Sequence, residues 1–104
     1  MSEVVVTAVF VPAEGKRDEL VAALREAIPA VHEEPGCVLY AIHDAEDDTI
    51  TMLEKWSSAA ELDAHAVGAP VTRLNQLIDG LIASPVVVTR MTAIPAGTDE
   101  QGLV

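Results

Sequence analysis

The chain has 104 residues, half of them hydrophobic, and its 17 acidic and 6 basic residues give a net charge of −11. A chain of this length forms one domain. A surface this negative repels phosphate backbones and anionic lipids, so neither nucleic acid nor a membrane is expected as a partner. The single cysteine excludes an internal disulfide and favours a reducing, cytoplasmic location.

The high hydrophobic content also indicates self-association. A domain of this size buries only roughly two thirds of the surface that its unfolded chain exposes. Half of these residues are hydrophobic, so we expect part of the remaining apolar surface to contact a second copy. A homodimer is therefore predicted.

Residues 3–11 are rich in valine and predict a strand, which Pro12 and Gly15 end. Residues 16–33 predict a helix, because apolar residues recur there at helical spacing. Pro29 falls inside this apolar stripe, so a bend or a restart of the helix is expected near residues 25–29.

Five further elements follow in order. Two strands joined by an acidic turn predict a hairpin, and Ser58 followed by Glu61 has the form of a capping box that starts a short helix. The expected elements are strands 37–44 and 49–56, helices 58–67 and 71–82, and a strand over 86–94.

The order β-α-β-β-α-β predicts an α+β, ferredoxin-like domain over residues 1–95, with a four-stranded antiparallel sheet and helices on one face. Residues 96–104 are expected to form a flexible tail or an arm on a partner. The first strand is apolar on both sides, with Val4 and Val6 on one and Val5 and Val9 on the other. Helices cover only one face, so the other requires a second sheet. Two sheets packed face to face would form a dimeric α/β barrel.

The middle of the chain carries most of the residues capable of chemistry. They lie between positions 34 and 65 and are Glu34-Pro35-Gly36-Cys37, Tyr40, His43, Glu54-Lys55-Trp56, Leu62 and His65. In these residues the chain resembles the antibiotic-biosynthesis monooxygenase family, which includes quinol monooxygenases and haem-degrading enzymes. The resemblance in pattern spans about residues 3–95. It implies a dimeric ferredoxin-like barrel that oxidises aromatic substrates with O2 without metal or flavin, in a pocket between the sheet and the helices.

Two departures from the family pattern affect the choice of activity. Many members carry a second histidine where this chain has Val71. Haem degraders that resemble this domain use an asparagine, a tryptophan and a histidine, and here only Trp56 matches, with Thr7 at the asparagine position. The resemblance therefore favours oxidation of an aromatic over degradation of haem.

The predicted catalytic residues are His65 and Trp56. A histidine exchanges protons near neutral pH and can deprotonate a phenol, and a tryptophan can stack on an aromatic substrate. Each residue also has an alternative, purely structural role: His65 would be a buried, hydrogen-bonded residue, and Trp56 would be part of the core. The predicted substrate-binding residues are Tyr40, His43, Met52, Leu53 and Glu54.

Two of these residues carry further expectations. Tyr40 and His43 lie three positions apart in a strand, so they point to opposite faces, and Tyr40 is expected to share its face with Val38. A carboxylate at position 54 is costly among apolar neighbours unless it is paired. We expect Arg90 of the last strand to form that ion pair.

No metal or cofactor is predicted. The three histidines lack ligand spacing, Cys37 has no basic neighbour to activate it, and no glycine-rich phosphate loop occurs. The leading hypothesis is a cofactor-independent monooxygenase that oxidises a small phenol or hydroquinone with O2. A non-catalytic small-molecule-binding or accessory protein and an isomerase or lyase on the same fold stay open as alternatives.

Overall fold

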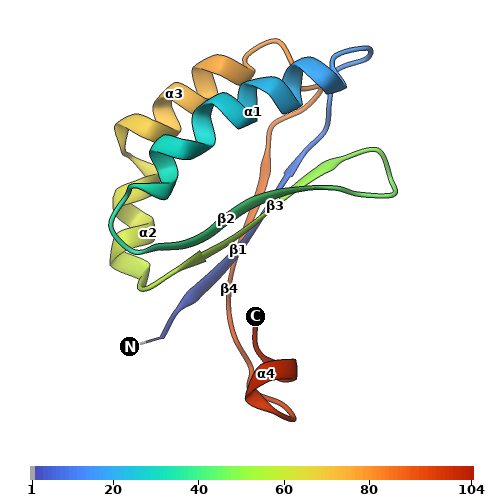
Figure 1. Cartoon of the computed structure of the whole chain (residues 1–104). Helices are drawn as coiled ribbons and strands as arrows, with labels where there is room; N and C mark the ends of the chain where they lie inside the picture. Colours follow the sequence, from blue (N-terminus) through green and yellow to red (C-terminus); the bar gives the residue numbers. More distant parts are fainter. Residues whose placement is uncertain (1) are drawn as a thin grey trace.

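The computed structural model describes residues 2–104 and shows one antiparallel sheet with strand order β2-β3-β1-β4. Three helices lie together on one face of this sheet, and a short fourth lies beyond the end of β4 (Figure 1). The predicted ferredoxin-like α+β fold is confirmed. Its elements are β1 (Val4–Phe10), α1 (Arg17–His32), β2 (Cys37–Asp44), β3 (Ile50–Trp56), α2 (Ala59–Ala66), α3 (Ala69–Ile78), β4 (Val87–Thr92) and α4 (Asp99–Gly102).

The central strands β1 and β3 alternate between buried and half-buried residues along their whole length. This period of two places one set of side chains under the helices and the other on the uncovered face. The helix-side set is almost completely buried and forms the floor of the core. It comprises Val4, Val6, Ala8 and Phe10 from β1 and Ile50, Met52, Glu54 and Trp56 from β3.

Helix α1 runs unbroken from residue 17 to residue 32, so the restart considered for the segment around Pro29 does not occur. Pro29 lies on the exposed side of the helix. Its ring therefore does not interrupt the apolar stripe, and the stripe holds the helix against the sheet on either side of the proline. The buried residues of this stripe are Leu20, Leu24, Ala27 and Val31.

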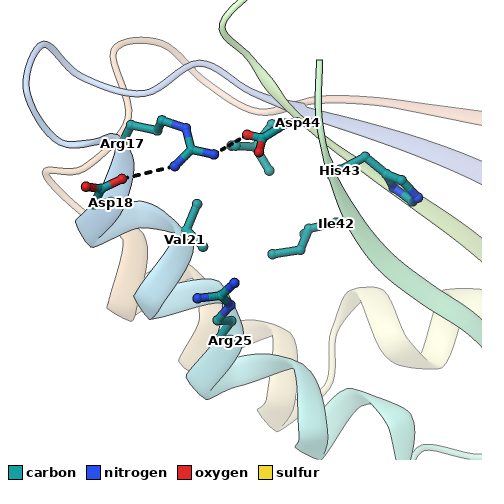
Figure 2. A pocket seen from close by; sticks show the side chains of 8 residues that line it. Arg17, Asp18, Val21, Arg25, Ile42, His43 and Asp44 are labelled. Carbon is teal, nitrogen blue, oxygen red and sulfur yellow. Dashed lines mark hydrogen bonds and ion pairs between the residues drawn. The ribbon is translucent and has the colours of Figure 1, made fainter. Parts of the chain in front are cut away.

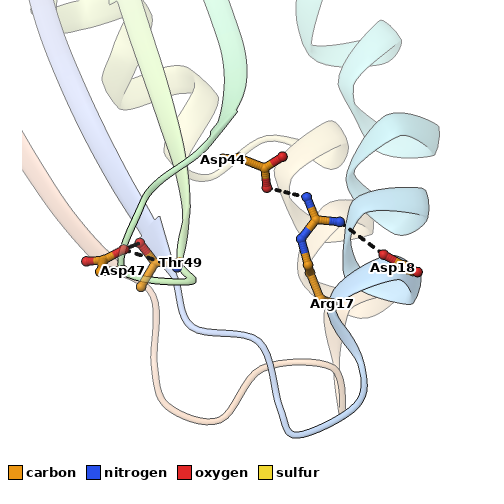
Figure 3. Close-up of polar contacts among 5 residues, drawn as sticks. All are labelled: Arg17, Asp18, Asp44, Asp47 and Thr49. Carbon is orange, nitrogen blue, oxygen red and sulfur yellow. Dashed lines mark hydrogen bonds and ion pairs between the residues drawn. The ribbon is translucent and has the colours of Figure 1, made fainter.

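The β2–β3 hairpin ends in a turn that its own side chains stabilise. Asp47 Oδ1 accepts hydrogen bonds from the backbone N–H of Thr49 at 3.1 Å and from its hydroxyl at 2.6 Å (Figure 3). Asp48 has φ of 67°, a left-handed conformation that aspartate tolerates better than most residues. At the end of β2, just before the turn, Asp44 contacts Arg17, which also contacts Asp18, so the start of α1 is joined to the end of β2 (Figure 3).

Strand β2 contains a bulge, which the sequence did not predict. Cys37 pairs with Trp56 and Leu39 pairs with Lys55, so Val38 is an extra residue without a partner. Val38 is consequently 53% exposed, and the expectation that it shares the face of Tyr40 is wrong. Beyond the bulge, Tyr40 is buried under the helices and His43 is exposed on the other face, which confirms that the two side chains diverge.

The last third of the chain departs from the predicted boundaries. Helix α3 ends at residue 78 rather than 82, because the chain turns at Gly80, whose φ is 79°. The tail contains α4 and turns back onto its own domain, where Lys55 Nζ donates to the carbonyl oxygen of Val104 at 2.7 Å. Within residues 2–104, no helix combines the length and the apolarity that crossing a bilayer requires.

The face of the sheet opposite the helices, here called the open face, has no layer above it (Figure 1). Strand pairing brings its apolar side chains together across all four strands. They are half-buried or exposed, and they include Val5, Val9, Leu39, Leu53, Val87 and Met91.

Candidate functional site

A cavity of about 210 Å³ lies between the helix side of the sheet and helices α2 and α3. Its wall is mostly apolar but carries several polar side chains, which is the usual character of a small-molecule site. Its volume lies below the roughly 300–1,000 Å³ of sites for drug-sized ligands, so a one- or two-ring compound fits best. The lining residues are Phe10, Tyr40, Glu54, Leu62, His65, Ala66, Val71, Leu74, Asn75, Val86, Val88 and Arg90.

Trp56 and Glu54 occupy the same side of β3, two residues apart. The indole of Trp56 is fully buried, and its Nε1 donates a hydrogen bond to Glu54 Oε1 at 3.0 Å. Burial raises the pKa of Glu54, although the indole hydrogen bond, His65 and Arg90 partly offset that effect. The carboxyl group of Glu54 is therefore easier to protonate than an exposed glutamate.

The predicted ion pair between Glu54 and Arg90 does not form. Both residues flank Val6 of β1, one from each neighbouring strand, which separates their backbones by about two strand spacings of 4.7–4.9 Å. Arg90 instead reaches across to α2 and donates to Asp63 Oδ1 at 2.6 Å. This ion pair joins the edge strand β4 to the helix layer at the rim of the cavity.

His65, near the end of α2, is only 5% exposed and packs against two aromatic rings. Its imidazole lies over Trp56 with ring centroids 4.5 Å apart and the planes tilted by 33°. The ring of Tyr40 is steeply inclined to the same imidazole, at 71°, with ring centroids 5.5 Å apart. The ring of His65 therefore packs against side chains of both β2 and β3, which restricts its rotation.

The side chain of Glu34, from the loop after α1, completes this group. Its Oε2 lies 2.7 Å from Nδ1 of His65. An ionised carboxylate only accepts hydrogen bonds, so this contact favours a proton on Nδ1, which leaves the lone pair of a neutral imidazole on Nε2. Among residues 2–104, no hydrogen bond involves Nε2, and no fully buried side-chain nitrogen or oxygen lacks a partner. Nε2 is therefore accessible, at the wall of the cavity.

Tyr40 contributes a phenol to the same cavity. Burial is the main cause that raises the pKa of its hydroxyl above the ordinary value of 10.0, and the negative charges of Glu54 and Glu34 raise it further. Tyr40 therefore stays a neutral phenol at physiological pH. In that form its hydroxyl can donate a hydrogen bond to a ligand oxygen.

The structure separates the predicted site residues into two groups. Tyr40, Glu54 and His65 line the cavity, and Trp56 packs directly behind His65. Met52 is fully buried in the core and is not part of the cavity wall.

The remaining two predicted residues, His43 and Leu53, lie on the open face, because strand alternation turns them away from the helices. His43 borders a separate, shallow surface hollow and points away from Arg17 and Arg25 (Figure 2). Neither side chain can contact a ligand held beneath α2 and α3.

Glu34 is a candidate site residue that the sequence interpretation did not include. It belongs to the Glu-Pro-Gly-Cys motif, but nothing in that motif indicates a contact with a histidine 31 positions later. The described part of the chain contains no group of three or more histidine, cysteine, aspartate or glutamate residues placed to hold an ion.

Comparison with known protein families identifies the family to which the residues of the cavity belong. The model of the antibiotic biosynthesis monooxygenase family matches residues 3–75, which include every polar residue of the cavity except Arg90. No curated protein matches the chain.

Solved structures agree with the family match. Rv0793 from Mycobacterium tuberculosis is 26% identical with a TM-score of 0.82, covering 93% of this chain and all of that one. The protein SO0527 from Shewanella oneidensis is 29% identical with a TM-score of 0.78, covering 88% and 90% of the two chains. A structure described as an antibiotic biosynthesis monooxygenase is 26% identical with a TM-score of 0.79, covering 88% and 99%.

Proposed function

We propose that this chain, which belongs to the antibiotic biosynthesis monooxygenase family, oxidises a small phenol or hydroquinone with O2 and needs no metal or flavin. The observation that supports this most is the accessible Nε2 of His65 in a cavity of about 210 Å³. A neutral imidazole nitrogen there is placed to take a proton from a phenolic hydroxyl. The apolar wall favours the aromatic ring of such a substrate.

The proposed reaction begins with that proton transfer. A phenolate is a much stronger reductant than a phenol, so it can pass an electron directly to O2. The superoxide formed then bonds to a ring carbon of the substrate radical, and the resulting hydroperoxide loses water. Hydroquinone and O2 thereby give hydroxyquinone and water, and the substrate supplies all four electrons.

The other residues of the site have supporting roles. The neutral hydroxyl of Tyr40 can donate a hydrogen bond to a substrate oxygen, and Trp56 fixes the plane of the His65 ring. The apolar side chains of Leu62, Leu74 and Val88 exclude water from the radical pair.

We further propose that the chain is a cytoplasmic homodimer that joins two open faces into a barrel. The apolar side chains of the open face, Leu53 and Val87 among them, support this assembly. The cavity lies on the other side of the sheet, so each copy would keep its own site. The lone Cys37 is consistent with a reducing compartment.

The experiment is oxygen uptake with a panel of one- and two-ring hydroquinones and phenols. We expect one O2 consumed per hydroxyquinone formed, and a decrease in kcat of about 10²- to 10⁴-fold for His65→Ala, the range for loss of a general base. His43→Ala is the matched control, because it removes an imidazole from the open face.

Two results would contradict the proposal. Equal turnover by the wild type and His65→Ala would remove the role given to this histidine. Tight binding of the same aromatics without oxygen uptake would indicate a small-molecule-binding protein instead.

A further inference from the structure

The contact between Glu34 and His65 is short, and unlike the ion pair of Arg90 with Asp63 it is shielded from solvent. The side chains are 15% and 6% exposed, and Oε2 lies 2.7 Å from Nδ1. A hydrogen bond to an ionised group in such surroundings is about twice as strong as one between neutral groups. The contact joins the loop after α1 to α2, so it orients the ring relative to the rest of the cavity.

The other carboxylate oxygen of Glu34 lies at the beginning of α3. A Cβ atom built on Gly68, the residue that precedes this helix, would be 3.3 Å from Glu34 Oε1. The N-terminal end of a helix carries a partial positive charge that favours a nearby anion. Because Gly68 has no side chain, it leaves room for the carboxylate of Glu34 beside this end of α3.

We propose that Glu34 is a positioning residue that fixes His65 in the tautomer with the proton on Nδ1, which leaves Nε2 free to act as a base. The inference rests on the proposed function, in which Nε2 takes the proton of the substrate. Glu54 does not share this task, because its hydrogen bond comes from the indole of Trp56. The two carboxylates at the site therefore have different partners, one for the imidazole and one for the indole.

The direct test is the nitrogen-15 NMR spectrum of the histidine side chains in the whole chain at about pH 8, where an unperturbed imidazole is neutral. We expect nearly all of His65 in the Nδ1-protonated tautomer in the wild type. In Glu34→Gln, which keeps the size but can also donate, that tautomer should fall to a minor fraction. Glu33→Gln, which removes an exposed charge one residue earlier, is the matched control and should leave the spectrum of His65 unchanged.

Gly68→Ala provides a second variant that keeps every charge. Its methyl group would crowd Glu34 Oε1 and the backbone oxygen of Ala64 at 3.2 Å, so it should displace the carboxylate and shift the tautomer population in the same direction as Glu34→Gln. It keeps the inference testable if Glu34→Gln does not fold.

Kinetics separate this inference from the proposed function. With an active aromatic substrate, Glu34→Gln should lower kcat by about 10²-fold or more with little change in KM. A wild-type His65 protonated on Nε2, or the same tautomer population in wild type and both variants, would overturn the positioning role even in an active enzyme. If no substrate is oxidised, the proposed function fails, and the NMR result still decides the role of Glu34.

Discussion

The two faces of the sheet are both apolar, but only one of them carries the candidate site. The three aromatic residues of the chain, Phe10, Tyr40 and Trp56, all lie on the helix side. Two of the buried polar side chains, Glu54 and His65, lie there as well. The open face has mainly valine, leucine, methionine and threonine instead, and its ionisable side chains, His43 and Lys55, are not buried. This difference shows how the two kinds of surface can be told apart. An apolar face alone indicates packing against another layer, whereas polar side chains buried within an apolar layer indicate a candidate binding or catalytic site.

Trp56→Ala should have the largest effect on stability of the substitutions that compare the two faces. The indole is fully buried on the helix side, so we expect the free energy of unfolding to fall by about 3–5 kcal/mol, measured by urea denaturation. Leu53→Ala, from the open face of the same strand, should cost about 1 kcal/mol at a dilution that keeps the chain monomeric, because that side chain is only half-buried within one copy. Equal losses in the monomer would mean that burial does not distinguish the two faces.

Leu53→Asp should prevent formation of the dimer without changing the cavity. A charge in the middle of the open face is costly to bury against a second sheet, so light scattering should show monomers where the wild type gives dimers. Val67→Asp is the matched control, because Val67 is 85% exposed on the helix side of the molecule. A monomeric wild type would end the barrel hypothesis.

Glu54→Gln should have the smallest effect, and that effect should depend on pH. The pKa of Glu54 is raised in the folded state above its ordinary 4.5, so at pH values just above 4.5 the folded state binds more protons than the unfolded state. The folded state therefore loses stability as pH rises from 4.5 through the raised pKa. Glutamine does not ionise and can still accept the indole hydrogen bond. Compared with the wild type, we expect Glu54→Gln to melt about 2–5 °C higher at pH 8 and at the same temperature near pH 4.

Differential scanning calorimetry at both pH values measures this difference. Glu46→Gln, an exposed position in the hairpin turn, controls for the lower net negative charge. If the increase in Tm for Glu54→Gln were the same at both pH values, burial of the carboxylate would not be its cause.

Local patterns in the sequence were sufficient to predict most of the fold. Alternation placed Trp56 and Glu54 on one face of β3, and the Ser58 hydroxyl accepts the backbone N–H of Glu61 as the capping box predicted. The same alternation would have assigned His43 and Leu53 to the open face had it been applied to the site. His43 was included because of the resemblance to the family, and Leu53 because an apolar pocket wall was expected beside Met52 and Trp56.

The contacts that depend on tertiary structure could not be predicted. Glu34 meets His65 only because α2 packs beside the loop after α1, and Arg90 pairs with Asp63 because β1 separates it from Glu54. Neither partner follows from spacing along the chain. The bulge at Val38 belongs to the same class, since it depends on how β2 pairs with β3.

Because of that bulge, the beginning of β2 tolerates the loss of a residue better than the rest of the strand does. Val38 is the surplus residue, so its deletion would leave Cys37 and Leu39 paired with their present neighbours in an ordinary ladder. Removing one residue between positions 40 and 44 would instead reverse the orientation of the side chains on one side of the cut. Natural or engineered insertions and deletions of one residue are therefore best tolerated at the beginning of this strand, before Tyr40, where they leave the direction of the Tyr40 side chain unchanged.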